Sequence, residues 1–326
     1  MAVGFNLPSR SSARLLFNDP ARALKEALIR PYQGLWYTAT SRYPIGTNVF
    51  ERDWDLLVVL DACRVDAVRE IANEYEFITE VDSIVSVGSN SHEWLAQTFS
   101  EAWSREIAKT TYVTANFHSG FVFRDRRLPP DRIDVPFYWT DWDVVDSDEF
   151  REVVDVWDTH RNDTFGVTPP HAVTDHVIDR RRSNEAPRII AHYMQPHGPY
   201  IANAVRTGEE PTDIESGAWR SLRDGKASRA KIWELYLDNL RVVLDQIEVL
   251  LKNVDAETVA ITADHGEAFG EFGAYGHPEG FPHPVVKKVP WIETSAEDLG
   301  TRTPELETDS DTEVPVEERL EALGYA

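Results

Sequence analysis

Short apolar runs that alternate with helical patterns constrain the fold of this chain more than any other feature of its sequence. Leu56–Leu60 is a continuous apolar run bounded by charged residues, which is typical of a central strand covered on both faces. Similar extended runs cover 109–116, 188–194 and 257–264, and 289–294 is expected to form the last strand. Strands that alternate with helices predict an α/β fold, with a central, mostly parallel sheet covered by helices on both faces.

Helical patterns fill the stretches between these runs. Three of them predict helices over 64–74, 93–103 and 171–182, and the segment 77–87 favours one or two further strands. The strongest pattern follows the polar stretch 203–227, and its apolar residues recur at helical spacing. These residues are Ile232, Leu235, Leu240, Val243, Leu244, Ile247 and Leu251.

The flanking segments lack such regular patterns. Residues 1–50 are expected to be a lead-in, with a short helix over 21–28 and irregular structure from Pro31 onward. Residues 51–326 are expected to form the main domain. Within it, the stretch from about 120 to 170 is rich in Asp, Pro, Trp and Phe, and we interpret it as an insertion that shapes one side of a pocket.

The end of the chain is expected to form a smaller carboxy-terminal lobe from about residue 270. Residues 295–315 are acidic and predict a mobile segment. The segment 316–326 then predicts a short closing helix.

The charge of the chain restricts its partners. It carries 56 acidic and 33 basic residues, 7 of which are lysines, for a net charge of −23. This balance argues against nucleic acid as a partner. Acidic charge spread along the chain, with few lysines, favours a protein that stays dissolved at high salt, where the screening length falls to about 3 Å at 1 M. We therefore expect a halophilic source, the alternative being an ordinary acidic cytosolic protein.

The sequence also indicates a location. It opens without the basic and apolar regions of a secretory signal, and a single cysteine, Cys63, excludes an internal disulfide. No uncharged apolar run approaches the roughly 20 residues of a spanning helix. A soluble, cytoplasmic protein is therefore expected, and the short amphipathic run before residue 30 allows peripheral membrane contact.

Polar residues follow three of the predicted strands. Asp61 follows the first, His192 and His197 lie at the end of another, and Asp264 and His265 follow a third. Because neighbouring strand ends lie about 5 to 10 Å apart, Asp61, Asp264 and His265 can converge on one ion. Two carboxylates and one imidazole suit Zn²⁺ or Mn²⁺ better than Ca²⁺. Asp61 alone is as well explained by a helix cap, and the alternative for Asp264 and His265 is a capping Asp with a surface His. Taken together, the three residues favour one divalent metal ion.

Hydroxyl groups cluster where an extended run meets a helix, in SVGSNSHEWL (86–95). A helix amino terminus favours a bound phosphate or sulfate and lowers the cost of an alkoxide. A serine bound to the metal there would be a nucleophile toward phosphorus or sulfur. Counting back from the helix favours Ser91, and the glycine of GSNS favours Ser89. The alternative for either serine is a helix cap.

Together these segments resemble the sulfatase-like members of the alkaline phosphatase superfamily. The resemblance rests on LDACRVD, the serine cluster, QPHGPY, TADHGE and LEALGY, which follow the family's order and span about residues 54 to 326. It implies the family's phosphatase or sulfatase fold.

The resemblance also implies roles for single residues. Asp61 is similar to the family's first metal aspartate, and Asp264 and His265 to its metal-binding pair. His197 resembles the histidine that contacts the transferred group or assists the leaving oxygen. His277 stands where relatives place a Lys or His facing the substrate.

Two further residues are candidates for binding the substrate. Arg64 follows the first strand and is expected to face the anion, since a guanidinium matches its oxygens bidentately. His192 either joins the site or packs beneath it.

The chain departs from sulfatases proper in two places. It lacks the Cys/Ser-x-Pro-x-Arg signature that yields formylglycine, and Cys63 lies beside Asp61 instead, so no formylglycine is expected. Ala62 stands where sulfatases often have a second Asp, which weakens the case for Ca²⁺. The pattern is closer to the single-metal branch of phosphodiesterases and phosphoglycerol-type transferases.

We therefore expect a metal-dependent hydrolase of sulfate or phosphate esters, acting on a small molecule or a glycan, with a metal-bound serine as nucleophile. Two alternatives stay open: a phosphoglycerol-type transferase acting on a glycan or lipid, and a non-catalytic relative that binds an anion. The sequence leaves the oligomeric state open.

Overall fold

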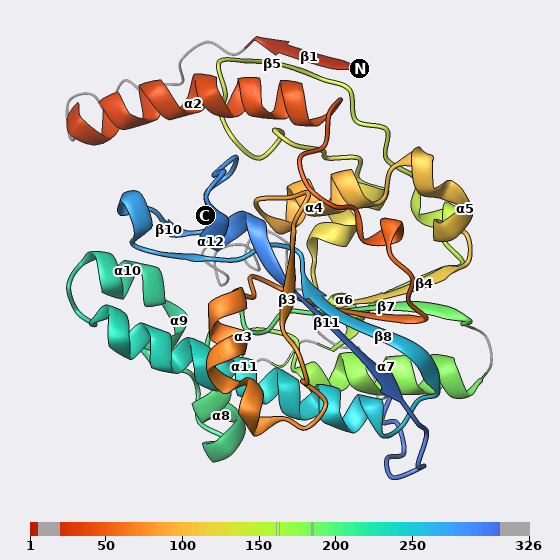
Figure 1. The fold of residues 1–326 in the computed structure, drawn as a ribbon. Helices are drawn as coiled ribbons and strands as arrows, with labels where there is room; N and C mark the ends of the chain where they lie inside the picture. The colour runs from red at the N-terminus through yellow and green to blue at the C-terminus, as the bar shows by residue number, and fades with distance from the viewer. Residues whose placement is uncertain (6–19, 161, 163, 184–185, 307–326) are drawn as a thin grey trace.

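A seven-stranded sheet runs through the centre of the computed structural model, which describes residues 1–5, 20–160, 162, 164–183 and 186–306 (Figure 1). The strand order is β3-β11-β8-β2-β7-β4-β6. In chain order, these strands are β2 (Leu56–Leu60), β3 (Asp82–Val85), β4 (Thr110–Thr114), β6 (Glu152–Asp155), β7 (Arg188–Tyr193), β8 (Ala256–Ala263) and β11 (Lys288–Ala296). Pairing from β8 through β6 is parallel, and β11 is antiparallel to both of its neighbours. The predicted α/β class with a mostly parallel sheet is confirmed.

The central strands form where the sequence is rich in apolar and β-branched residues, and β2 alone among β2, β4 and β8 is continuously apolar. All residues of β2 and of β4 are buried, as are the last five residues of β8. A strand that is buried on both faces needs helices above and below it. The predicted strands over 109–116, 188–194, 257–264 and 289–294 correspond to β4, β7, β8 and β11.

Helices cover both faces of this sheet. Figure 1 shows α3, α7 and α11 on one face and α4 and α5 on the other. The helices of the main domain are α3 (Val65–Ile71), α4 (Ser91–Thr98), α5 (Ser104–Ile107), α6 (Val156–Thr159), α7 (Pro170–Arg182), α8 (Ala202–Thr207), α9 (Asp213–Ser216), α10 (Ala218–Arg223), α11 (Arg229–Leu251) and α12 (Pro284–Lys287). The longest of them, α11, buries most of the predicted apolar stripe and is capped by Ser228, whose hydroxyl accepts the N–H of Lys231.

The amino-terminal part is more regular than the sequence indicates. Instead of a short helix and irregular structure, α2 (Pro20–Thr40) continues through Pro31 for a total of 21 residues. It packs on a two-stranded sheet of β1 (Ala2–Phe5) and β5 (Phe137–Thr140). Tertiary packing therefore holds a helix that the proline alone would be expected to end.

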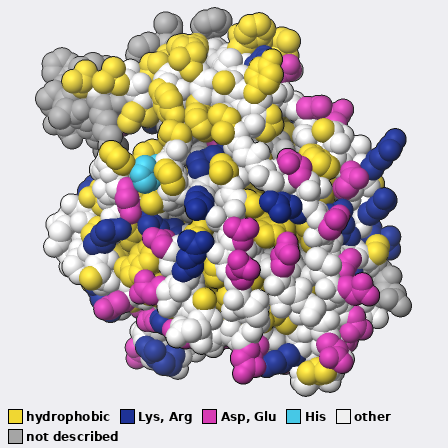
Figure 2. Space-filling view, viewed as in Figure 1, with side chains coloured by type: hydrophobic (Ala, Val, Ile, Leu, Met, Phe, Trp, Pro, Cys, Tyr) yellow, Lys and Arg dark blue, Asp and Glu magenta, His cyan; other side chains and the backbone are white. Residues whose placement is uncertain are grey.

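The face of this amino-terminal layer is apolar. Leu24, Leu28 and Leu35 of α2 are 57 to 68% exposed. Figure 2 shows hydrophobic side chains gathered over this layer, while charged side chains of both signs dominate the surface below it. Among the described residues, no helix is long and apolar enough to cross a bilayer.

The stretch interpreted as an insertion contributes to the central sheet. It contains β6, the edge strand that pairs with β4. The sequence did not indicate this strand because all four of its residues are only half buried, so that no apolar run marks it. At the other end of the main domain, β11 enters the central sheet after a two-stranded ribbon of β9 (Ala268–Phe269) and β10 (Tyr275–Gly276). The predicted closing helix over 316–326 lies outside the described residues.

Candidate functional site

Two aspartates from adjacent strands meet at one edge of the sheet. β2 and β8 are paired with Leu60 opposite Ala263, so the next residues, Asp61 and Asp264, lie side by side. Both carboxylates are fully buried. The Nε2 atom of His265 lies 3.5 Å from Asp61 Oδ1 and 3.4 Å from Asp264 Oδ2. The structure thus brings together the three residues expected to bind a metal ion.

Hydrogen bonds orient these three side chains toward a common point. Asp264 Oδ1 accepts two backbone N–H groups at 3.1 and 2.8 Å, which leaves Oδ2 facing its neighbours. Asn116 donates to Asp61 Oδ2 at 2.9 Å. His265 Nδ1 lies 2.9 Å from the carbonyl of Gly266, and as the donor of this bond it leaves a lone pair on Nε2. Among the described residues, no hydrogen bond reaches Asp61 Oδ1.

Ser91 adds a hydroxyl to this cluster. It is the first residue of α4, whose N-cap is Asn90. Its Oγ lies 2.7 Å from Asp264 Oδ2, 3.4 Å from Asp61 Oδ2 and 3.3 Å from His265 Nε2. The helix amino terminus therefore places the hydroxyl of Ser91 beside all three candidate ligands.

Ser89 has a different environment. Its hydroxyl donates to Glu93 Oε2 at 2.7 Å and accepts the backbone N–H of Gly280 at 2.8 Å. The bond from Gly280 ties this hydroxyl to the loop that follows β10, and the bond to Glu93 ties it to the first turn of α4. This geometry is that of a residue that holds two segments together.

The buried charges of the site fit a divalent cation. Burial raises the pKa of Asp61 well above its usual value, and the negative charges of Asp264 and Glu267 raise it further. Burial also lowers the pKa of His265 to about 4, so its imidazole is neutral near pH 7 and can bind a metal. Two buried carboxylates, one of which has an oxygen without a hydrogen bond, are stabilised together only by a positive charge between them. The donor set therefore fits Zn²⁺ or Mn²⁺.

A second group of possible ligands lies next to the first. His197, Glu267 and His277 each offer one ligand atom, and these atoms lie within 4.8 Å of one another. The ring of His277 is 4.5 Å from that of His265 and 5.1 Å from that of His197, measured between centroids. Burial lowers the pKa values of both His197 and His277 to about 4 and raises the pKa of Glu267 to about 7.

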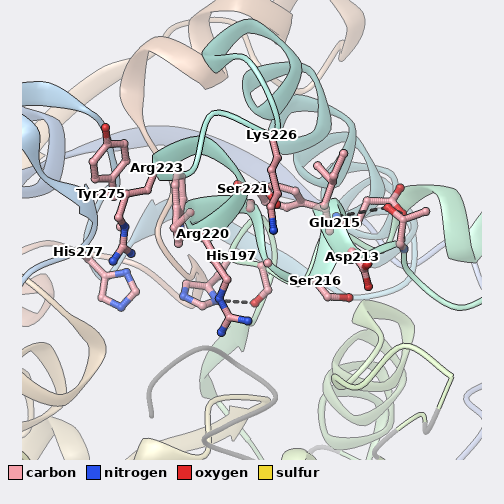
Figure 3. A pocket seen from close by; sticks show the side chains of 18 of the residues that line it. His197, Asp213, Glu215, Ser216, Arg220, Ser221, Arg223, Lys226, Tyr275 and His277 are labelled. Atoms are coloured by element: carbon pink, nitrogen blue, oxygen red, sulfur yellow. Dashed lines mark hydrogen bonds between the residues drawn. The ribbon is translucent and has the colours of Figure 1, made fainter.

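Two histidines of this second group face open space. His197 and His277 line a cavity of about 1200 Å³, and Figure 3 shows their rings on the same side of it. The predicted pair of proton-transfer residues thus lies between the buried cluster and a space that can admit a substrate.

The two predicted substrate-binding residues, Arg64 and His192, are not among the residues that line the cavity. Arg64 is 5% exposed and makes ion pairs with Asp66 and Glu271 at 2.6 and 3.1 Å. Its guanidinium is thus already paired with two carboxylates. His192 is fully buried, with Nδ1 2.7 Å from the hydroxyl of Tyr112 and Nε2 3.7 Å from Asp264 Oδ2. It could serve as a ligand together with Asp61 and Asp264.

Sequence reasoning missed one residue of the buried cluster. Asn116 donates to Asp61 and lies two residues after the end of β4. A polar residue at the end of a predicted strand was the signal used for Asp61 and Asp264, and Asn116, the last residue of the predicted 109–116 strand, carries the same signal. Glu267 is fully buried beside His197 and His277, which makes it a further candidate ligand.

Comparisons with known proteins give only distant likenesses. No protein-family model and no curated protein matches the chain. Among solved structures, similar ones include the soluble domain of lipooligosaccharide phosphoethanolamine transferase A from Neisseria meningitidis, at 15% identity and a TM-score of 0.43 over 74% of this chain and 76% of that one.

Two further solved structures are similar to a comparable degree. The zinc complex of the C-terminal periplasmic domain of EptC from Escherichia coli has 12% identity and a TM-score of 0.41, over 78% of this chain and 76% of that one. A structure described as BT1596, a 2-O GAG sulfatase, has 12% identity and a TM-score of 0.45, over 83% and 70%. The similar structures therefore include both transferases and a sulfatase, and likenesses this distant do not decide between their activities. The cytoplasmic location stays a prediction.

Proposed function

We propose that this chain is a metal-dependent enzyme that cleaves phosphate or sulfate esters, with Ser91 as its nucleophile. The observation that carries the proposal is the position of Ser91 Oγ, 2.7 Å from Asp264 and within 3.4 Å of Asp61 and His265. A serine hydroxyl at a helix amino terminus, among three metal-ligand side chains, has the surroundings that activate it for attack on phosphorus or sulfur.

The roles of the residues follow from this geometry. Asp61, Asp264 and His265 would hold one divalent cation, with His192 as a further candidate, and His197, Glu267 and His277 could hold a second. A cation bound there supplies Lewis-acid stabilisation of negative charge and lowers the pKa of a nearby hydroxyl. Ser91 donates its hydrogen bond to Asp264 Oδ2, which leaves a lone pair on Oγ for the attack.

The proposed reaction has two steps. In the first step, Ser91 gives its hydroxyl proton to Asp264 Oδ2, the acceptor of its hydrogen bond, and Oγ forms a bond to the central phosphorus or sulfur while the bond from that atom to the alcohol oxygen breaks. His197 or His277 gives a proton to the departing oxygen, since the nearby negative charge of the ester raises the pKa of an imidazole that burial had lowered. Water then attacks the Ser91 ester, releases phosphate or sulfate, and restores the hydroxyl.

Turnover of three chromogenic esters tests the proposal: p-nitrophenyl phosphate, bis-p-nitrophenyl phosphate and p-nitrophenyl sulfate, in high salt with Mn²⁺ or Zn²⁺. We expect turnover of at least one ester, its loss on chelation, and its loss in Asp61→Asn and Asp264→Asn. Asp238→Asn, on the exposed side of α11, is the matched control and should keep full activity.

Two other outcomes would change the assignment. Release of p-nitrophenol only when a sugar or glycerol alcohol is added would identify a transferase that uses the same site. No release from the folded, metal-loaded protein under any of these conditions would contradict the proposed catalysis.

A further inference from the structure

The cavity beside His197 and His277 extends well beyond the reacting centre. Its volume is about 1200 Å³, several times what a phosphate or sulfate group needs, and it is lined by 212–221 and 275–278. The first segment carries α9 and α10, and the second follows the candidate ligand Glu267 on the ribbon of β9 and β10. The cavity therefore offers room for a part of the substrate that does not react.

Basic side chains converge on this cavity. Arg220, Arg223 and Lys226 all line it. Figure 3 shows Arg220 and Arg223 on the side of His197 and His277, while the acidic Asp213 and Glu215 lie toward the opposite side. In a chain with 56 acidic and 33 basic residues, a group of three cations at the mouth of the candidate site is contrary to the overall charge. It favours a negatively charged ligand.

The two arginines are available to such a ligand. Both are exposed, and within the part of the chain that the structure describes neither makes an ion pair. Lys226 is only 3.8 Å from Asp224, at the limit of an ion pair, and both of these side chains are exposed. By contrast, Arg64 is already paired with two carboxylates.

The local structure orients Arg220 and Arg223 toward the cavity. Arg220 and Arg223 are three residues apart on α10 and so lie on one face of the helix. The guanidinium of Arg223 lies 6.0 Å from the ring of Tyr275, which orients it by a cation–π contact. Trp219, which directly precedes Arg220, packs edge-on against Phe269 at 4.8 Å and so fixes α10 to the segment that follows Glu267.

The lining carboxylates do not cancel this charge. Glu215 is buried and accepts the backbone N–H and the hydroxyl of Thr212 at 2.7 and 2.8 Å, in the capping box of α9. That leaves Asp213 as the exposed carboxylate among the residues lining the cavity, against three basic side chains.

We infer that this cavity binds a second anionic group of the substrate, a carboxylate, sulfate or phosphate separate from the reacting ester, through Arg220 and Arg223. Guanidinium groups pair bidentately with the oxygens of such a group, and two of them on one helix face define its position. The substrate class is then an ester whose alcohol carries further negative charge. This inference rests on the proposed ester cleavage, and it adds the recognition of the part that leaves.

A matched set of fluorogenic esters tests the inference. The set is the umbelliferyl ester that the chain cleaves, its 3-carboxy derivative and its 3-sulfonate derivative, compared at one fixed salt concentration. We expect kcat/KM to be at least about tenfold higher for the two charged esters, which corresponds to about 1.4 kcal/mol. The two derivatives separate recognition of any anion from recognition of a carboxylate alone.

The variants Arg220→Gln, Arg223→Gln and the double variant should remove this preference. They should lower kcat/KM for the charged esters by about tenfold, mainly through KM, and leave the uncharged ester unchanged. Arg105→Gln, an exposed arginine on α5, is the control and should preserve the preference. Equal kcat/KM for all three esters in the wild type, or a preference that survives in the double variant, would overturn the inference while leaving ester cleavage intact.

Binding provides a readout that does not depend on turnover. Titration calorimetry of the 3-carboxy ester with the metal-loaded protein should show affinity about tenfold lower in the double variant than in the wild type. If no ester is cleaved, catalysis fails, and this titration alone decides the second anionic site. Equal affinities would then reject it.

Discussion

Ser91 and Ser89 are two residues apart, but their hydroxyl groups make different contacts, and we infer different roles for them. Ser91 Oγ lies among Asp61, Asp264 and His265, whereas Ser89 Oγ is used by Glu93 and by the backbone of Gly280. Ser91 therefore has the contacts of a nucleophile held at the candidate metal ligands, and Ser89 those of a residue that joins two segments. The same substitution at the two positions therefore compares two serines that are close in sequence but differ in their contacts.

We expect Ser91→Ala to lower kcat by roughly three orders of magnitude or more, since about 4 kcal/mol of transition-state stabilisation corresponds to that factor. Ser89→Ala should leave kcat within a few-fold of the wild-type value. It should lower the free energy of unfolding by about 1 to 3 kcal/mol, because Glu93 and Gly280 each lose a buried hydrogen-bond partner. Steady-state kinetics and denaturant unfolding measure the two effects. The reverse pattern would make Ser89 the nucleophile.

The buried amine of Lys287 lowers the stability of the folded protein when it carries a charge. Its amine is buried, and no hydrogen bond reaches it within the described residues. Burial lowers its pKa from 10.5 to about 8. The folded chain therefore releases this proton at a lower pH than the unfolded chain, and the penalty is present in full below pH 8 and disappears as the pH rises toward 10.5.

Lys287→Met is thus expected to stabilise the protein near neutral pH, by on the order of 3 kcal/mol, and to lose this advantage as the pH approaches the upper value. Urea unfolding at several pH values gives the difference. Lys288→Met, the exposed neighbour, is the control and should show almost no difference at any pH. A gain from Lys287→Met that does not vary with pH would show that it does not come from the charge.

At the scale of elements, sequence patterns predicted the strands that are buried on both faces. They missed the elements whose formation depends on packing against distant segments. The run behind β2 is continuously apolar and those behind β7 and β8 are rich in apolar residues, and all three strands occur in the central sheet. The four half-buried residues of β6 gave no such signal. The length of α2 was also missed, because the packing that carries the helix past Pro31 involves β5, more than 95 residues further along the chain.

Gly34 tests how α2 is held against β5. In the middle of a helix, Gly→Ala ordinarily stabilises by roughly 1 kcal/mol. Here a Cβ at Gly34 would lie 2.0 Å from the carbonyl oxygen of Phe137. Gly34→Ala is therefore expected to destabilise, by about 1 to 3 kcal/mol, as overpacking does. Leu28→Ala on the same helix, 68% exposed, is the control. If Gly34→Ala instead stabilised the protein in thermal unfolding, α2 would not be held in close contact with β5 at this position.

The same contrast holds for the site. Asp61, Asp264 and His265 could be proposed from sequence because they lie within two residues of the end of a strand, and the ligands of such sheets bind beyond the carboxyl ends of the strands. The cavity could not, since Arg220, Arg223 and Tyr275 come from segments whose approach is set by the packing of Trp219 on Phe269. The choice between Ser89 and Ser91 likewise needed the contacts of each hydroxyl.

For the molecule as a whole, charge is the dominant constraint. A net charge of −23 on 326 residues makes the folded state repel itself at low salt. We expect the thermal unfolding midpoint to rise by several degrees when NaCl is increased from about 0.1 M to about 1 M, over which the screening length falls from about 10 Å to about 3 Å. Calorimetry at several salt concentrations tests this. A midpoint that stays constant or falls would contradict the halophilic interpretation.

The proposed reaction requires a covalent bond to Ser91, and mass spectrometry of acid-quenched protein detects that bond directly. The metal-loaded chain is mixed with the ester that it cleaves, quenched during turnover and digested, and the peptide that contains both serines is fragmented. We predict one phosphoryl or sulfuryl group on Ser91, absent after chelation and absent in Asp264→Asn. Steady turnover with the group on another residue would contradict the central claim.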